Sequence, residues 1–234
     1  MARTEDGTLD RIMNELRARA DPASREGMAR YGIRTDHALG GSSLYFLRAM
    51  AKGLGKDHAL ALALWSTDVH EARLLATLVE DPQEVTEEQM EAWVADFDSW
   101  DICDQCTSNV FSYTSRGWTK AVEWSSREEE FVKRAGFALM AALAVHDKKA
   151  ENDRFDPFLS VIERESYDDR NYVRKAVNWA LRNIGKRNLA LNASAVACAE
   201  RIRAKGTKAG RWISSDALRE LRSEAVQKRL VKHK

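Results

Sequence analysis

Apolar residues recur at helical spacing along most of this chain, and the spacing predicts a succession of short helices. The first clear pair of helices is marked by Leu60, Leu64, Leu74, Leu75 and Leu78. The polar segment 66–68 separates the two helices, and Asp81-Pro82 ends the second, because proline cannot continue a helix. No segment alternates apolar and polar residues as a strand does, so we predict an all-α fold.

Later helices are predicted from their start and stop signals. Thr86 with Gln89 three residues later has the pattern of a capping box, which predicts a helix through Ala95. Ser99 is expected to cap the next helix. Further helices are expected over residues 125–143, 156–162, 168–185 and 192–206, with Ser214-Ser215-Asp216 near the start of the last one.

Two of these helices repeat one another. The segments FVKRAGFALMAAL (131–143) and YVRKAVNWALRNI (172–184) share an aromatic-Val-basic-basic-Ala opening, 41 residues apart. A period near 40 residues with two helices per unit is typical of HEAT-like repeats, which line a concave surface with their second helices. We therefore predict a single HEAT-like solenoid over residues 1–234, an α-α superhelix whose last few residues form a disordered basic tail.

Charge is distributed unevenly although the net charge is only +1. Residues 51–110 hold three Lys and Arg against thirteen Asp and Glu, whereas residues 111–234 hold 26 against 16. A basic half suits a polyanion such as DNA, but helix faces that are merely solvated can also differ in charge. Three cysteines, an odd number, indicate a reducing compartment, and the charged N-terminus is unlike a signal peptide. We expect a cytoplasmic protein with no membrane segment.

The segment DSWDICDQC (98–106) carries the candidate chemistry. Trp100 and Asp104 are four residues apart and share a helix face. Counted by repeats, Asp104, Arg134 and Lys175 fall at similar positions, and Trp179 lies four residues after Lys175. These residues are expected to line one groove. Cys103 and Cys106 have no second Cys or His pair nearby, so we expect no metal and no cofactor.

Four segments resemble the DNA alkylation repair (AlkD-like) family of HEAT-like-repeat DNA glycosylases: MARYGI (28–33), SWDICD (99–104), FVKRAGFALM (131–140) and KAVNWALRNIGKRN (175–188). The resemblance implies release of cationic N3- and N7-alkylated purines from duplex DNA. It also implies that Trp100, Asp104 and Trp179 lie at the sugar of the lesion, with Arg134 on a nearby phosphate and Tyr31 beside the site.

Cations of the same segments are added as predicted DNA contacts: Lys133, Arg174, Lys175, Arg182, Lys186, Arg187 and Arg211. The sequence departs from the resemblance at Ser214-Ser215, where a basic pair is expected, and Arg211 with Trp212 could substitute for it. Cleavage of an N-glycosidic bond develops positive charge on the sugar, as in glycoside cleavage. A carboxylate at Asp104 could stabilise that charge or orient the attacking water.

Three functions remain open from the sequence. The first is a monofunctional, monomeric DNA glycosylase that acts on alkylated purines, as the acid between two tryptophans suggests. The second is a non-catalytic DNA-binding solenoid that recognises bent or branched DNA. The third is a protein-interaction scaffold, which would need an apolar or acidic groove rather than the basic half of residues 111–234.

Overall fold

Helices make up the regular structure of residues 7–232, the part of the chain that the computed structural model describes, and no strand occurs among them. The predicted all-α fold is confirmed. The helices group into two compact units, Met1–Thr114 and Ser115–Lys234, which are described in turn. That a single repeat array spans both units stays a prediction. Among the described helices, none has both the length and the apolar character needed to cross a membrane.

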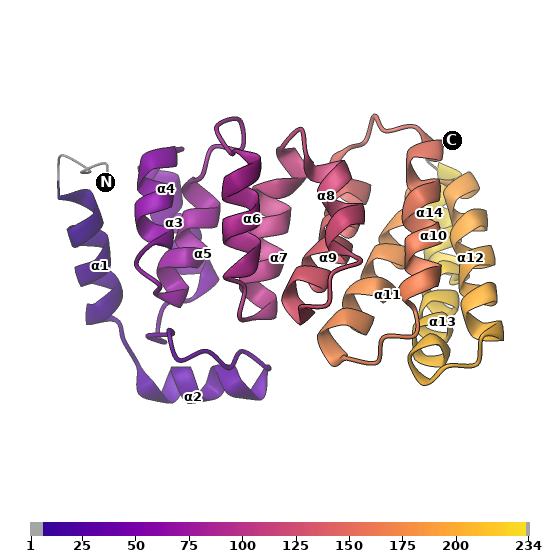
Figure 1. Cartoon of the computed structure of the whole chain (residues 1–234), viewed down its shortest axis with the longest axis horizontal. Coiled ribbons are helices and arrows are strands. Elements are labelled where there is room, and N and C mark those ends of the chain that lie inside the picture. The colour runs from indigo at the N-terminus through magenta and orange to yellow at the C-terminus, as the bar shows by residue number, and fades with distance from the viewer. Residues whose placement is uncertain (1–6, 233–234) are drawn as a thin grey trace. The chain divides into compact units, whose positions relative to one another are not determined.

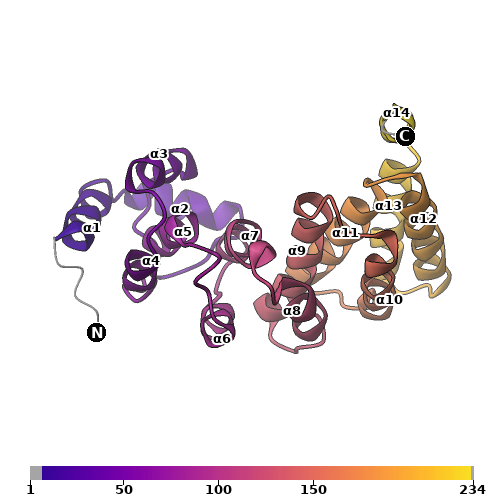
Figure 2. The same cartoon turned by 90° about the horizontal axis from the view of Figure 1, so that it is seen from above.

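The first unit is built around one buried helix (Figures 1 and 2). Its helices are α1 Thr8–Ala18, α2 Pro22–Arg30, α3 Leu44–Leu54, α4 His58–Trp65, α5 His70–Val79, α6 Glu87–Ala95 and α7 Trp100–Asn109, followed by the short turn η1 Phe111–Tyr113. Helix α5 packs against α3, α4 and α7, and its residues 70–77 are all buried. The rings of Trp65 and Trp93 stack with centroids 4.0 Å apart, which adds aromatic contact to the burial of apolar area.

The second unit has two layers of helices (Figure 2). Its elements are α8 Gly117–Trp124, α9 Glu130–His146, η2 Asn152–Phe155, α10 Asp156–Glu165, α11 Asn171–Gly185, α12 Leu189–Ala204, α13 Lys208–Leu221 and α14 Glu224–Lys232. Helices α9, α11 and α13 pack in a row, α8 covers α9, and α12 covers α11 and α13. Gly136 permits the close approach of α9 to α8, because a Cβ there would lie 2.5 Å from the backbone nitrogen of Ser125.

The repeat register is confirmed by the helix starts. Asp104, Arg134 and Lys175 are each the fifth residue of their helices, α7, α9 and α11. Several contacts between successive helices of the second unit join residues 38–43 apart in sequence, such as Arg134 with Tyr172 and Arg187 with Ala144. The first unit has a shorter repeat, since its corresponding contacts join residues 31 or 32 apart.

Several predicted boundaries are wrong at helix starts. Helix α8 was not predicted. Ser125, the predicted start of the next helix, instead follows the end of α8, and α9 begins at Glu130. Helix α12 begins at Leu189 because Asn188, not Asn192, caps it by accepting the backbone N–H of Leu191. The side chain of Asn192 instead donates to the carbonyl of Gly185. By contrast, the cap at Thr86 and the start of α10 agree with the sequence.

The end of the chain also differs from expectation. Ser214, Ser215 and Asp216 lie in the middle of α13, whose N-cap is Thr207, and the hydroxyl of Ser214 donates back to the carbonyl of Arg211. A further helix, α14, then continues to Lys232, so the chain up to that residue is not a disordered tail. The predicted disorder of residues 233–234 lies outside the described residues.

Candidate nucleic-acid interface

The first turns of α7 carry the predicted acid and the first of its two tryptophans. Trp100 is the first residue of α7 and Asp104 lies one turn later, so the two side chains share a face. Both side chains are half-buried, whereas Ile102, Cys103 and Cys106 point into the core. The amphipathic turn therefore presents an acid and an indole together at the surface.

Segment 31–40 is tied to the starts of α5 and α7. The indole N–H of Trp100 donates to the backbone carbonyl of Tyr31 over 3.0 Å, and the Thr35 hydroxyl donates to Asp98 over 2.5 Å. Glu71, which is buried, accepts the backbone N–H groups of Leu39 and Gly40 at 3.0 and 2.7 Å. These bonds bring Tyr31, whose side chain is 78% exposed, beside Trp100.

A buried ion pair fixes the N-terminal turn of α7 on α5. His70, 1% exposed, lies with its Nε2 2.9 Å from a carboxylate oxygen of Asp101. Burial opposes charge on His70, but the hydrogen bond and charge of Asp101, with the charges of Glu71 and Asp98, together raise the pKa of the imidazole. Burial likewise opposes ionisation of Asp101, yet its hydrogen bond to His70 lowers the pKa of that carboxyl.

The stabilisation from this pair is expected to fall as the pH rises. A raised pKa means that the folded state holds the His70 proton more tightly, so the contribution is complete below about pH 6.5 and is lost above the raised value. The free energy of unfolding of the wild type minus that of His70→Gln should be larger at about pH 5.5 than at about pH 9. Urea denaturation at both pH values measures it, and an equal difference at the two would contradict the charged pair.

Cys103 and Cys106 lie on the opposite, buried side of α7. Burial raises the pKa of the Cys106 thiol well above its ordinary value, with smaller contributions from Cys103 and Glu80. A buried thiol that stays protonated is a poor nucleophile and a poor metal ligand. Among residues 7–232, no group of three or more His, Cys, Asp and Glu side chains could hold a metal ion.

In the second unit, α11 carries one face of mixed aromatic and basic residues. Lys175, Trp179, Arg182 and Lys186 follow at spacings of four, three and four residues, which places them along one side of the helix. Lys175 is exposed and Trp179 is half-buried. We call these four residues the α11 stripe.

Acids of α13 neutralise part of the α11 stripe. Arg182 donates to Glu220 over 2.5 Å and lies 3.5 Å from Asp216, while the Lys186 ammonium lies 2.8 Å from Glu220. Burial raises the pKa of Glu220, but Lys186 and Arg182 outweigh it and lower the pKa overall. A phosphate that contacts Arg182 must therefore compete with Glu220, whereas Lys175 has no carboxylate among its described hydrogen-bond partners.

Two predicted DNA contacts are interior residues. Lys133 is 5% exposed, and its ammonium lies 2.9 Å from Glu165 and 3.5 Å from Asp168. Arg134 is 6% exposed and donates to the backbone carbonyl of Tyr172 over 2.7 Å. Lys133 thus compensates buried acids and is left out of the proposed contacts, and Arg134 holds the first turn of α11 against α9.

The remaining predicted cations lie closer to solvent. The guanidinium of Arg174 stands over the ring of Trp212 at 5.1 Å, and Trp212 is the fifth residue of α13, in register with Lys175. Arg211 is exposed and donates to the carbonyl of Gly206. Arg187 donates to the carbonyl of Ala144, at the end of α9, and to that of Ala150 in the segment that follows.

Each unit therefore gathers its own part of the predicted site. Tyr31, Trp100 and Asp104 meet in the first unit, and the α11 stripe with Arg174 and Trp212 lies in the second. That both parts line one groove stays a prediction. The buried pair of His70 and Asp101 was not predicted from the sequence. A shared offset of 31 residues, which also joins Trp65 to Asp96, was the available signal.

Comparisons with known proteins cover residues of both units. A model of the family described as DNA alkylation repair enzyme matches residues 12–221. A search of the curated proteins found no match. Among solved structures, the chain is similar to one described as a new family of proteins related to the HEAT-like repeat DNA glycosylases with affinity for branched DNA structures. The identity is 17%, the TM-score is 0.72, and 82% of each chain is covered, which confirms the HEAT-like fold.

Proposed function

The chain belongs to the family of DNA alkylation repair enzymes, and on that basis we propose that it is a monofunctional DNA glycosylase. Its substrates are cationic N3- and N7-alkylated purines in duplex DNA, which it releases by hydrolysing the N-glycosidic bond. One observation carries the proposal. Asp104 lies one helical turn from Trp100 on the surface-facing side of α7, and Trp100 is held beside the exposed Tyr31.

Hydrolysis of the N-glycosidic bond is favoured by a carboxylate near the positive charge that develops on the sugar. As the glycosidic bond breaks, positive charge builds on the sugar, and Asp104 stabilises it or orients the attacking water. One unit charge at about 4 Å and an effective dielectric near 20 contributes about 4 kcal/mol. Because an alkylated purine already carries positive charge and leaves easily, a contribution of this size is enough. The indole faces of Trp100 and Trp179 attract such a cation, at about 0.5–2 kcal/mol each.

The α11 stripe and its surroundings supply the proposed contacts to DNA phosphates. Lys175 and Arg211 are exposed, and Arg174 is held over Trp212. Arg182 and Lys186 can join them by exchanging Glu220 for phosphate, since both ion pairs are only partly buried. Such contacts position DNA without reading its sequence, which suits an enzyme that must find a lesion in any context.

A second candidate is a DNA-binding protein without catalytic activity that prefers branched DNA. It is favoured by the shared fold with the solved structure whose family is described as having affinity for branched DNA structures. Asp104 argues for the enzyme, because a carboxylate is the group that stabilises positive charge developing on the sugar.

The test is release of free base from duplex DNA that carries N7-methylguanine, monitored by chromatography under single turnover. We expect release above the spontaneous rate, without added metal or nucleotide, since no cofactor is proposed. Undamaged duplex of the same sequence is the substrate control. Binding that is tighter for a four-way junction than for the lesion duplex, with no release of base, would contradict the proposal and support the second candidate.

A further inference from the structure

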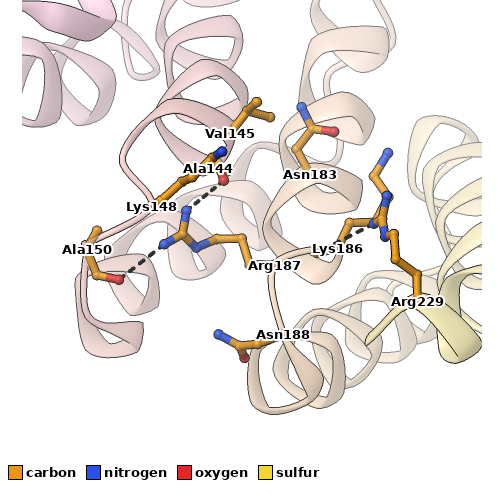
Figure 3. A pocket seen from close by; sticks show the side chains of 9 residues that line it. All are labelled: Ala144, Val145, Lys148, Ala150, Asn183, Lys186, Arg187, Asn188 and Arg229. Atoms are coloured by element: carbon orange, nitrogen blue, oxygen red, sulfur yellow. Dashed lines mark hydrogen bonds between the residues drawn. The ribbon is translucent and has the colours of Figure 1, made fainter. Parts of the chain in front are cut away.

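A basic pocket lies in the second unit, and Trp179 is not among the residues that line it (Figure 3). It has a volume of about 600 Å³, within the range of pockets that hold ligands. Its lining comes from the last turn of α9, the segment that follows, the ends of α11 and α14, and the start of α12. The lining residues are Ala144, Val145, Lys148, Ala150, Asn183, Lys186, Arg187, Asn188 and Arg229.

Four of the nine lining residues are cations and none is an acid. Lys148 and Arg229 are exposed, and Lys186 is the last member of the α11 stripe. The nearest compensating acids lie outside the lining. Glu220 pairs with Lys186, and Asp147 is engaged by Trp118 and Arg154. The pocket therefore holds an excess of positive charge and favours an anion.

Carbonyl groups that would repel an anion are already occupied. Arg187 donates to the carbonyl of Ala144, at the end of α9, over 2.7 Å and to that of Ala150 over 3.2 Å. Its guanidinium also stands over the ring of Phe155 at 4.5 Å, which fixes its position. Arg229 donates to the carbonyl of Lys186 at the end of α11, as Figure 3 shows.

The start of α12 adds to the positive electrostatic potential of the pocket. Asn188 is its N-cap and lines the pocket, so the N-terminal end of a 16-residue helix lies beside the cavity. Helix N-termini carry partial positive charge and favour anions such as phosphate. The four cations and this helix start therefore act on the same space.

We propose that this pocket is a binding site for a backbone phosphate of DNA, a second anchor separate from the residues at the lesion. The inference rests on the proposed function in that it takes DNA as the partner. Lys186 links the two places, because it ends the α11 stripe and lines the pocket. A strand held along the stripe is thus carried into the pocket, where Lys148, Arg187 and Arg229 hold its phosphate.

The test compares two double variants that lose the same charge. Lys148→Ala/Arg229→Ala removes the exposed cations of the pocket and spares Arg187, whose bonds support the fold. Arg203→Ala/Lys232→Ala removes two exposed cations that do not line it. The dissociation constant for an undamaged duplex is measured across a range of salt concentrations. Each phosphate contact contributes about −0.9 to the slope of log K against log salt, so we expect the pocket variant to be shallower by about 0.9 and the control unchanged.

A charge-preserving variant, Lys148→Arg/Arg229→Lys, should restore the slope, and thermal unfolding should show that all three variants are folded. Equal slopes for the pocket variant and the control would overturn the proposal. So would inorganic phosphate that binds the wild type at this pocket while DNA binding ignores the substitutions, because the site would then serve free phosphate. Undamaged DNA is the ligand, so the outcome is independent of base release, which tests the glycosylase proposal alone.

Discussion

Single-turnover release of 7-methylguanine by an Asp104→Asn variant is expected to be about tenfold to a thousandfold slower than by the wild type, which corresponds to roughly 1.4–4 kcal/mol of lost transition-state stabilisation. The substitution keeps the size of the side chain and removes its charge. Affinity for the lesion duplex should change little, because the charge that Asp104 opposes develops only as the bond breaks.

Two controls separate chemistry from folding. Asp10→Asn removes one exposed acid from α1, far in sequence from α7, and is expected to leave the rate of base release unchanged. Trp100→Ala is expected to weaken lesion binding as well as the rate, because the indole supplies contact area and cation attraction. Release at the wild-type rate by a folded Asp104→Asn protein would defeat the catalytic assignment and favour the second candidate function.

Periodicity was sufficient to predict that the chain is helical and which positions correspond between repeats. Asp104, Arg134 and Lys175 were predicted to be equivalent, and each is the fifth residue of its helix. This succeeds because the 3.6-residue period fixes the angular position of every side chain around a helix. Trp212, the fifth residue of α13, extends the register to the last repeat and could have been found in the same way.

The same register could not predict which cations reach solvent. Lys133-Arg134 and Arg174-Lys175 are equivalent pairs in sequence, yet the first is buried and Lys175 is exposed. The difference is set by tertiary contacts, since residues 132–144 of α9 are buried on all sides between α8 and α11. Burial of that kind depends on neighbours that a single helix does not encode.

Long-range contacts explain the other misses. The position of Tyr31 depends on the hydrogen bond from the indole of Trp100, 69 residues later, and no local pattern in segment 31–40 predicts that bond. Likewise, Glu220 and Asp216 lie 38 and 34 residues after Arg182, and only the packing of α13 on α11 places them against it. In a repeat protein, the carboxylate partners of each cation therefore have to be known before that cation is assigned to DNA binding.

Among the cations first predicted to bind DNA, substitution of the buried Lys133 is expected to have the largest effect on stability. Its ammonium lies 2.9 Å from Glu165 and 3.5 Å from Asp168, and all three side chains are less than one-tenth exposed. Removing one partner of a buried ion pair costs about 3–5 kcal/mol, because the other charge stays buried without compensation. Arg164 and Arg170 also contact these acids, so Lys133→Met is expected near the lower end of that range.

Urea denaturation of Lys133→Met and of the double variant Lys133→Met/Glu165→Gln measures the effect. The double variant should be the more stable of the two, because the amide removes the charge that the single substitution leaves uncompensated. Lys175→Met, which replaces the exposed cation of the next repeat, is the matched control, and its free energy of unfolding should change by no more than about 0.5 kcal/mol.

The two variants should have the opposite order of effects on DNA affinity. Folded Lys133→Met should bind duplex DNA as the wild type does, and Lys175→Met should bind it more weakly. A Lys133→Met protein of wild-type stability that loses affinity for DNA would return Lys133 to the interface.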